Sequence, residues 1–524
     1  MAFLGMYRHA RTAHVQSITG ETFISLGTNA LSGKDICTEG GVIALAEGDL
    51  RNHSQLARAF RLPYHSRPSA IVMRAYKTWG VDYPSHIEGA VMTAVIDRAE
   101  DRMIVTRDRM GALPVYYSWR ARSTAFASRA EFLLLAGAAG RMVNREGLCE
   151  ILAMGGVYTP GRTPFRDIRM LEAGCMLLSD GRGVRVKRYY SLISAVEKKE
   201  RSDYATFRES YVSAAGEMSR KQPGILIMGS PGDIALSGAI ERKYRECPRG
   251  YALKDRITPE YRKEILNLNL SLEDLSTDGD ELFDCMEENA HIMGFPGYKW
   301  EDALFMLAVK GASKHEKNLA ASMDDGLYAR GGIFPWAEGD NALTYVKRWV
   351  KEKLNADQYV NDRRHEMLDR LLFSGGADAC DDQLVSNLQY ALFALPAVSQ
   401  KRWAIAHHMG VKLHSPMFDE RVVVNLVCAG EDGCVERLAM EMSGAEMVNE
   451  KRLRIAQMPP EAFEKRVLED ALRIASDDNE PVSRLADADK IKKHVRGGCA
   501  DIGALCSILQ LNRFLIEFEA ETEL

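Results

Sequence analysis

The sequence has neither a long hydrophobic run nor a surplus of basic residues. No apolar run approaches the ~20 residues that a membrane-spanning helix needs, and no long apolar segment follows the basic residues near the N-terminus. The chain has 68 Lys and Arg against 73 Asp and Glu, a net charge of -5, so no overall basic field exists to hold nucleic acid or anionic lipid. We therefore expect a cytoplasmic protein without nucleic acid or membrane among its partners.

Clustered cysteines are also missing. The ten cysteines occur singly, with no CxxC pair and no Cys/His group at metal-ligand spacing, which argues against a zinc site and a disulfide-held scaffold. What remains is the composition of an ordinary globular protein, 46% hydrophobic and 27% charged. A chain of 524 residues is too long for a single core, so two or three domains are expected.

The hydrophobic pattern changes part-way along the chain. Val91–Asp97 and Arg102–Arg107 alternate as half-buried strands do. Ala303–Lys314 has helical periodicity, and Ile225–Met228 is the short apolar run of a buried parallel strand. The change falls in the charged stretch Ser191–Tyr204, where we place a domain boundary. The first domain is predicted to be sheet-rich α+β, and the second α/β to mostly helical.

One hairpin carries the most specific signal. Residues 87–117 read IEGAVMTAVIDRAEDRMIVTRDRMGALPVYY, two strands joined by the polar turn Arg98–Asp101. Gly111 stands where a positive φ is needed, and Pro114 stops any helix. The segment resembles the glutamine amidotransferase domain of asparagine synthetases, whose pattern is RDR.G.KPLYY. Further segments resemble that domain in the same order, at residues 48–52, 126–131, 156–174 and 188–190.

This resemblance implies a fold for the whole chain. Residues 1–195 would form an α+β sandwich of the Ntn-hydrolase-like αββα type. Residues 196–524 would form an α/β ATP-pyrophosphatase domain, similar to the adenine nucleotide α-hydrolases, with a helical C-terminal part.

The amidotransferase-like domain lacks the nucleophile that the resemblance requires. A glutaminase of this family needs Cys directly after the initiator Met, with its free α-amino group as the base. Position 2 is Ala2, and the first cysteine, Cys37, is better interpreted as a loop or core thiol. The loss resembles β-lactam synthetases and lasso-peptide cyclases, which use an amine already present in the substrate. We therefore predict no glutaminase activity.

A strand, a turn of small residues and a helix form a candidate phosphate nest in the second domain. In such a turn, backbone N–H groups and the helix dipole converge on an anion. The turn matches the place of the family's pyrophosphate loop, SGGxDS. The resemblance implies that its ATP-binding residues are Gly229, Ser230, Gly232 and Asp233.

Gly229 stands where the family pattern has its first Ser, and two further departures weaken phosphate binding. Pro231 removes an N–H donor and Ile234 removes a hydroxyl, so an ordinary strand-to-helix turn is the alternative. Ser374–Asp378 (SGGAD) fits the consensus better by letters. It lies too close to the later landmark Pro416–Asp419 for parallel units of ~30 residues each, so we interpret it as a loop between helices.

Carboxylates for Mg²⁺ are expected in residues 320–334, which resemble the family's acidic loop. Asp324 or Asp325 would hold Mg²⁺ on the ATP phosphates, and Gly331 and Gly332 would complete the nucleotide site. The alternative is that Asp324-Asp325-Gly326 forms a turn or a helix N-cap.

The family's phosphate-contacting lysine has no direct counterpart. Within residues 451–467, which resemble the relevant family segment, Val467 stands in its place. Lys465 and Arg466 are the neighbouring cations that could take over its catalytic role.

The Tyr–Glu pair with which β-lactam synthetases deprotonate the amine is not apparent either. Ala321 or Ser322 and Gln400 stand near those places. His407 and His408 are interpreted as packing or solvated residues rather than ligands, because no partner carboxylate or Cys sits at helix spacing.

The function implied by the resemblance is an ATP-dependent amide-bond synthetase that forms AMP and pyrophosphate. It would join a carboxylate to an amine of the same or a second substrate, in natural-product biosynthesis. The expected cofactors are ATP and Mg²⁺, and the expected partner is a small-molecule or peptide carboxylate/amine substrate, with a homodimer or a partner synthetase as further candidates. The altered positions leave an alternative open, a non-catalytic homologue acting as scaffold or partner subunit.

Overall fold

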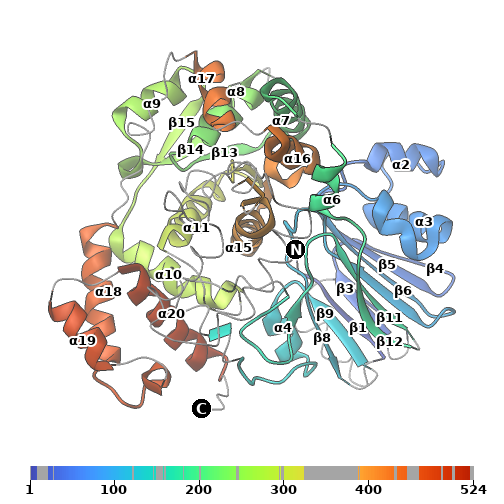
Figure 1. The fold of residues 1–524 in the computed structure, drawn as a ribbon, viewed down its shortest axis with the longest axis horizontal. Helices are drawn as coiled ribbons and strands as arrows, with labels where there is room; N and C mark the ends of the chain where they lie inside the picture. Colours follow the sequence, from blue (N-terminus) through green and yellow to red (C-terminus); the bar gives the residue numbers. More distant parts are fainter. Residues whose placement is uncertain are drawn as a thin grey trace.

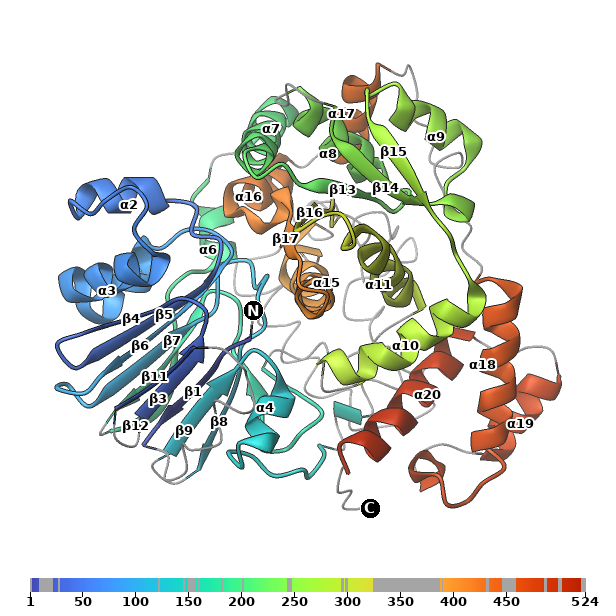
Figure 2. The same ribbon diagram turned by 180° about the vertical axis from the view of Figure 1, so that it is seen from behind.

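The described residues form three sheets. Two antiparallel sheets form the N-terminal part, one parallel sheet lies in the C-terminal part, and helices near the C-terminus lie beyond the parallel sheet (Figures 1 and 2). Within the part of the chain described here, no helix is long and apolar enough to cross a membrane. The computed structural model describes residues 2–8, 22–26, 29–120, 123–144, 147–148, 157, 161–180, 182–199, 202–242, 247–293, 296, 300–323, 387–388, 390–429, 433–444, 459–484, 488–497 and 502–519.

Each N-terminal sheet has six antiparallel strands. The first has the order β10-β8-β9-β1-β3-β2, with these strands at Arg169–Met170, Tyr116–Arg120, Ser123–Ala127, Leu4–Tyr7, Asn29–Gly33 and Thr22–Leu26. The second has the order β12-β11-β7-β6-β5-β4, with strands at Gly183–Arg188, Cys175–Asp180, Arg102–Thr106, Val91–Asp97, Val42–Gly48 and Ile36–Glu39.

Strand β5 shows how the layers are built. Val42 and Ala44 belong to a core shared with a helix, whereas Ile43 and Leu45 belong to the core that contains Leu31 of the other sheet, as the period of two along a strand requires. The covering helices α2, α3 and α4 span His53–Ala59, Pro68–Trp79 and Ala130–Leu135. Helix α3 packs on β5 and α4 on β8 and β9, so the predicted α+β sandwich of the first domain is confirmed.

The prediction that Val91–Asp97 is half-buried was wrong, because all residues of β6 are buried. A helical layer covers the face of β6 that the alternation of apolar and polar residues had predicted to face solvent. The hydroxyl of Tyr76 donates to Asp97 Oδ2 at 2.8 Å, and that of Tyr83 lies 2.8 Å from Thr93 Oγ1. Polar side chains on this face therefore bond to the helical layer instead of to water.

The turn after β7 is built around Arg107, whose side chain is buried. Its guanidinium donates to the carbonyls of Gly111, Leu113 and Leu171 at 2.6, 2.9 and 2.8 Å. It also donates to Gln400 Oε1 in the C-terminal domain at 3.2 Å. The arginine therefore donates hydrogen bonds to backbone carbonyls of two segments and links the turn to the C-terminal domain.

Asp108, the next residue, provides the hydrogen-bond acceptor for backbone N–H groups of the same turn. Its carboxylate accepts from the N–H groups of Met110, Ala112 and Leu113 at 3.2, 2.9 and 3.0 Å. Gly111 has φ +68°, which confirms the conformation expected from the sequence. The motif that carried the family resemblance is thus a structural corner.

The C-terminal sheet is parallel throughout, in the order β15-β14-β13-β16-β17. Its strands span Ser271–Leu275, Arg249–Leu253, Gly224–Ile227, Asn318–Ala320 and Lys412–His414. The chain winds outward from β13 to β15 and then returns to the other side of β13 as β16. The loops after β13 and β16 therefore meet at the carboxyl edge, where open α/β sheets bind ligands.

Helices surround this sheet and continue to the C-terminus. Helix α6, at Leu192–Glu197, leads from the last antiparallel strand toward the second domain, and the expected boundary at residue 195 falls within it. Helices α7 to α11 span Tyr204–Ser219, Pro231–Glu241, Pro259–Leu266, Gly279–Met293 and Trp300–Ala312. The later helices, α15 to α20, span Leu395–His408, Glu420–Ala429, Cys434–Ser443, Glu461–Ile474, Ala488–Arg496 and Ile502–Glu517.

A buried group of charges joins the two domains. Glu420, the first residue of α16, accepts from Arg51 at 2.9 Å and from Arg109 at 2.8 Å. Arg51 also pairs with Glu88 at 3.0 Å and lies 3.7 Å from Asp419. Glu420 is 8% exposed, so water hardly reaches its carboxylate. The charges of the two N-terminal-domain arginines are therefore compensated by a buried carboxylate of the C-terminal domain.

Candidate functional site

The loop between β13 and α8 is closed by its own carboxylate. Asp233 Oδ2 accepts from the N–H groups of Met228, Gly229 and Ser230 at 2.7, 2.8 and 3.1 Å. Ser230 in turn caps the N-terminus of α8, accepting from Asp233 N at 3.3 Å, so the two residues form a capping box. Asp233 is only 1% exposed. The N–H groups that would bind a phosphate are thus engaged by a side chain of the loop itself.

Two residues from elsewhere in the sequence complete this network. Ser322, just after β16, donates to Asp233 Oδ1 at 2.8 Å and lies 3.2 Å from the hydroxyl of Ser230. Tyr261, on α9, donates to the carbonyl of Ser230 at 2.8 Å and lies 3.3 Å from Asp233 Oδ2. No sequence motif indicates Tyr261, and the sequence indicates Ser322 only as a residue near the place of the tyrosine of β-lactam synthetases.

The two departures from the family loop have physical consequences here. Pro231 is the first residue of α8, a position where a missing N–H costs the helix nothing. Ile234 is fully buried, as is the rest of α8 up to Ile240. A serine at position 234 would therefore place a hydroxyl in an apolar surrounding, and its absence reflects the packing of this helix.

Several predicted site residues lie outside the described part of the chain. These are the metal candidates Asp324 and Asp325, the candidates Gly331 and Gly332, and the segment Ser374–Asp378. Among the described residues, no group of three or more His, Cys, Asp or Glu could hold a metal ion. Of the predicted nucleotide residues, the structure therefore brings together Gly229, Ser230, Gly232 and Asp233 only.

The predicted catalytic cations lie on α18, away from this loop. Arg466 pairs with Asp284 at 3.0 Å, and its guanidinium lies over the ring of Phe283 on α10. The Lys465 side chain is 75% exposed, and Val467 is fully buried. In both Figure 1 and Figure 2, α18 lies well apart from β13 and α8. In this arrangement neither cation reaches the β13–α8 loop.

The start of the N-terminal domain offers no activated thiol in its described residues. Ala2 packs partly buried against the core, and Phe3 N donates to Ser128 Oγ at 3.2 Å. Burial raises the pKa of the Cys37 thiol, and burial also raises that of Cys175 to about 11. A thiol with a raised pKa is a poor nucleophile at neutral pH.

Comparison with known proteins agrees with the N-terminal architecture. Residues 36–190 match the family described as glutamine amidotransferase domain. Over 239 residues the chain is 26% identical to "Asparagine synthetase [glutamine-hydrolyzing] 3" of Bacillus subtilis, covering 43% of this chain and 38% of that protein. The N-terminal part of the chain is thus similar to glutamine amidotransferase domains, and the chain is similar to asparagine synthetases.

A second protein similar to this chain comes from Methanocaldococcus jannaschii. It is a "Putative asparagine synthetase [glutamine-hydrolyzing] 2", 22% identical over 152 residues, which cover 28% of this chain and 29% of the relative. The matches thus span well under half of the relatives' own lengths. A solved glutamine phosphoribosylpyrophosphate amidotransferase of B. subtilis, with ADP and GMP, aligns with 53% of this chain and 81% of its own at 11% identity. Its TM-score of 0.28 is too low to carry an argument.

Gln400 was expected to stand near the place of the glutamate of β-lactam synthetases. In this chain it accepts a hydrogen bond from Arg107 and is 5% exposed. His408 lies 3.0 Å from Glu288, and the ring of His407 stacks on Trp403 with centroids 5.0 Å apart. These three side chains are held by packing and hydrogen bonds within the protein.

Proposed function

We propose that the chain is an ATP-dependent amide-bond synthetase without glutaminase activity. The observation that carries the proposal is the meeting of the β13–α8 loop and the β16 loop at the switch point of a parallel sheet. There the hydroxyls of Ser230 and Ser322 lie 3.2 Å apart beside the N-terminus of α8. Such an edge, with a helix dipole directed at it, suits a nucleotide phosphate.

The proposed chemistry is adenylation followed by amide formation. A substrate carboxylate attacks the α-phosphate of ATP and releases pyrophosphate, and an amine then displaces AMP. The hydroxyls of Ser230 and Ser322 would orient the phosphates, and donors at the helix N-terminus would stabilise negative charge in the transition state. Mg²⁺ would neutralise phosphate charge, held by Asp324 or Asp325, because carboxylate oxygens are the ligands that it prefers.

A specific observation favours the second candidate, a non-catalytic homologue. Asp233 already occupies three N–H groups of the loop, and its carboxylate is buried. A phosphate would have to displace this carboxylate from those donors. A scaffold or partner subunit needs the fold alone and leaves the closed loop undisturbed.

Calorimetry with ATP and Mg²⁺ separates the two candidates. We expect one ATP to bind per chain, and Ser230→Ala to weaken binding by about tenfold or more, since a hydrogen bond to a charged phosphate is worth about 1.5–3 kcal/mol. Ser237→Ala is the matched control, because this serine of the same helix is fully buried and its hydroxyl has no hydrogen-bond partner among the described residues. Absence of ATP binding by the unaltered chain would decide for the non-catalytic homologue.

Glutamine hydrolysis is expected to be absent. The motivation is Ala2 at the place of the nucleophile, together with the raised pKa values of Cys37 and Cys175. Glutamate release should stay at the level of a sample without protein, with or without ATP. Release that an active-site-directed glutamine analogue abolishes would contradict the prediction, and loss of that release in Cys37→Ala would identify a displaced nucleophile.

A further inference from the structure

A cleft of about 910 Å³ lies between the two domains, beside the edge strand β17. The N-terminal domain contributes the segment from Gly48 to Gln55, and the C-terminal domain contributes the end of α7, the end of α15 and β17 itself. A smaller cleft of about 340 Å³ adjoins it and shares His407 and Lys412. The larger volume is within the range of small-molecule sites, about 300–1,000 Å³.

Three charged or titratable groups from both domains meet in this cleft. Asp49 pairs with Lys221, which follows the end of α7, and His414 Nδ1 lies 3.9 Å from the Asp49 carboxylate. His414 Nε2 lies 3.3 Å from Asn318 Oδ1. Burial together with Lys221 and Lys412 lowers the pKa of His414 to about 4, so the imidazole is neutral at pH 7. The cations thus make the local potential unfavourable for a further positive charge.

The carboxylates that line the large cleft all have cationic partners. Asp49 pairs with Lys221, Glu88 with Arg51, and Glu217 and Asp419 with Arg421. Each of these four acids thus has a cationic partner other than Arg220, Arg67 or Lys412, with Arg421 shared by two of them.

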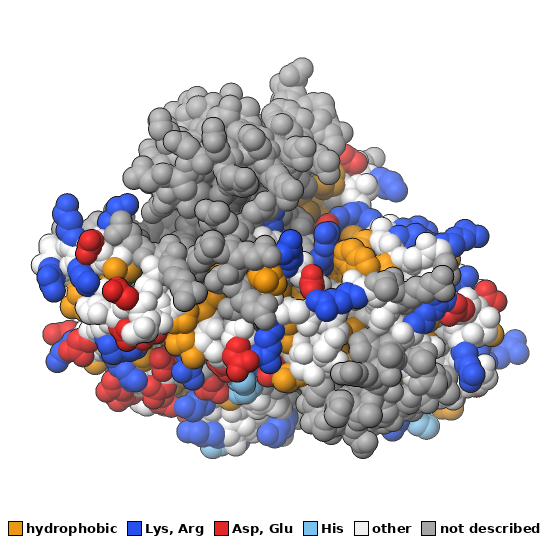
Figure 3. Space-filling model, turned by 90° about the horizontal axis from the view of Figure 1, so that it is seen from below, with side chains coloured by type: hydrophobic (Ala, Val, Ile, Leu, Met, Phe, Trp, Pro, Cys, Tyr) orange, Lys and Arg blue, Asp and Glu red, His pale blue; other side chains and the backbone are white. Residues whose placement is uncertain are grey.

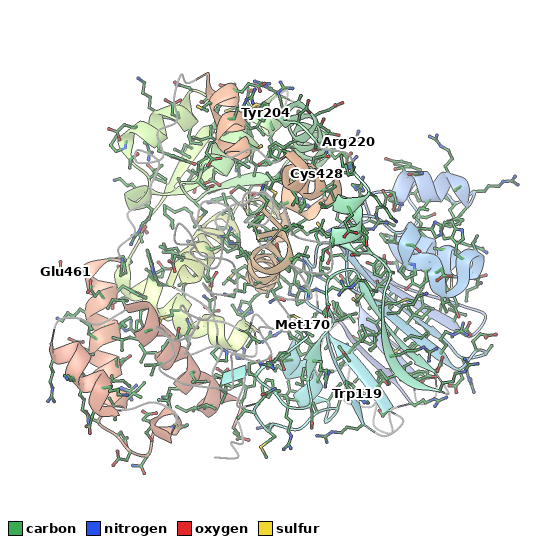
Figure 4. All side chains as sticks on the ribbon, in the orientation of Figure 1. Trp119, Met170, Tyr204, Arg220, Cys428 and Glu461 are labelled. Carbon is green, nitrogen blue, oxygen red and sulfur yellow. The ribbon has the colours of Figure 1, made fainter. Side chains whose placement is uncertain are left out.

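Three lining cations, in contrast, have no carboxylate partner among the described residues. They are Arg220 in the large cleft, Arg67 in the small one, and Lys412 in both, and all three are exposed. Figure 4 shows Arg220 at α7 on the side toward the N-terminal domain. On the face of the molecule seen in Figure 3, basic, acidic and hydrophobic side chains are interspersed.

A partly buried polar atom also lines both clefts. His407 Nε2 is shielded from water and has no hydrogen-bond partner in the described structure, while its ring stacks on Trp403 at an interplanar angle of 6°. The stacking fixes the orientation of the ring. Shielding a ring nitrogen from water without a hydrogen bond costs free energy, and a hydrogen bond with a bound polar group would offset that cost.

We propose that this interdomain cleft binds a small organic anion with at least two negative groups, held by Lys412, Arg220 and His407 Nε2. The site lies at the outer edge of the parallel sheet, on β17, whereas the proposed nucleotide site lies at the switch point between β13 and β16.

Calorimetric titration of the full chain with citrate and with inorganic phosphate, at constant ionic strength, tests the proposal. Both probes share the anionic chemistry; tighter binding of citrate indicates a polycarboxylate ligand, and tighter binding of phosphate a phosphorylated one. The double variant Lys412→Gln, Arg220→Gln should weaken binding about tenfold or more, because it removes two charged donors. Lys263→Gln, an exposed lysine of α9, is the control and should bind like the unaltered chain.

A second variant tests the role of His407. His407→Phe keeps an aromatic ring against Trp403 and removes the ring nitrogen, so it should weaken anion binding severalfold without lowering the melting temperature. The titrations are repeated with saturating ATP and Mg²⁺, and citrate binding should persist. Three results would overturn the proposal. They are no binding of either anion, binding by the double variant as tight as by the unaltered chain, and competition between citrate and ATP. A chain that fails to bind ATP can still bind citrate, so the two proposals fail independently.

Discussion

Glu420→Ala is expected to lower the free energy of unfolding by about 3–5 kcal/mol, because removing one partner of a buried ion pair leaves the other charge uncompensated. Two arginines of the N-terminal domain donate to this one carboxylate, Arg51 at 2.9 Å and Arg109 at 2.8 Å. Both arginine side chains are less than one-fifth exposed, at 18% and 15%, so water replaces the lost acceptor only in part. The loss should appear first as separation of the domains.

Chemical denaturation with two probes measures this effect. Near-ultraviolet circular dichroism follows side-chain packing, and limited proteolysis follows exposure of the connection between the domains. Glu172→Ala is the control, because Glu172 pairs with Arg188 at 2.6 Å on an exposed surface, where an ion pair contributes about 0–1 kcal/mol. A Glu420→Ala variant that unfolds within about 1 kcal/mol of the unaltered chain would show that Glu88 and Asp419 suffice for the arginines.

Asp108→Ala is expected to unfold the N-terminal domain or to leave it marginally stable. The substitution removes the acceptor of three backbone N–H groups, and each buried donor without a partner costs about 1–3 kcal/mol. Burial raises the pKa of Asp108, and the N–H groups together with Arg107 counteract that shift. Total stability of a domain is about 5–15 kcal/mol, so the loss of this one carboxylate removes much of it.

Urea unfolding followed by circular dichroism gives the size of the effect. Asp108→Asn retains one carbonyl acceptor and should lose clearly less stability than Asp108→Ala. Glu100→Ala, in the tip of the preceding hairpin, is the control, since Glu100 is 60% exposed and lies 3.5 Å from Arg102. Equal stability of Asp108→Ala and Glu100→Ala would mean that the corner after β7 does not depend on its carboxylate.

The sequence by itself determined the local elements. Gly111 is in the left-handed conformation that its place in the RDRMG motif predicted. The strand expected at Ile225–Met228 is β13 at Gly224–Ile227, and the helix expected at Ala303–Lys314 is α11 at Trp300–Ala312. These predictions succeeded because periodicity and turn chemistry depend on residues a few positions apart.

Only the tertiary structure decided how the loop between β13 and α8 is held. The residues that engage Asp233 are 28 and 89 positions away, at Tyr261 and Ser322, and only the winding of the parallel sheet brings them to the loop. Strand β6 is buried on both faces because α3 and the segment around Tyr83 cover the side that its alternation left polar. The interdomain cleft, with Lys221 and His414 around Asp49, likewise joins segments far apart in the chain. Such contacts follow from how whole layers pack, because the interactions that fix them join side chains with no relation along the sequence.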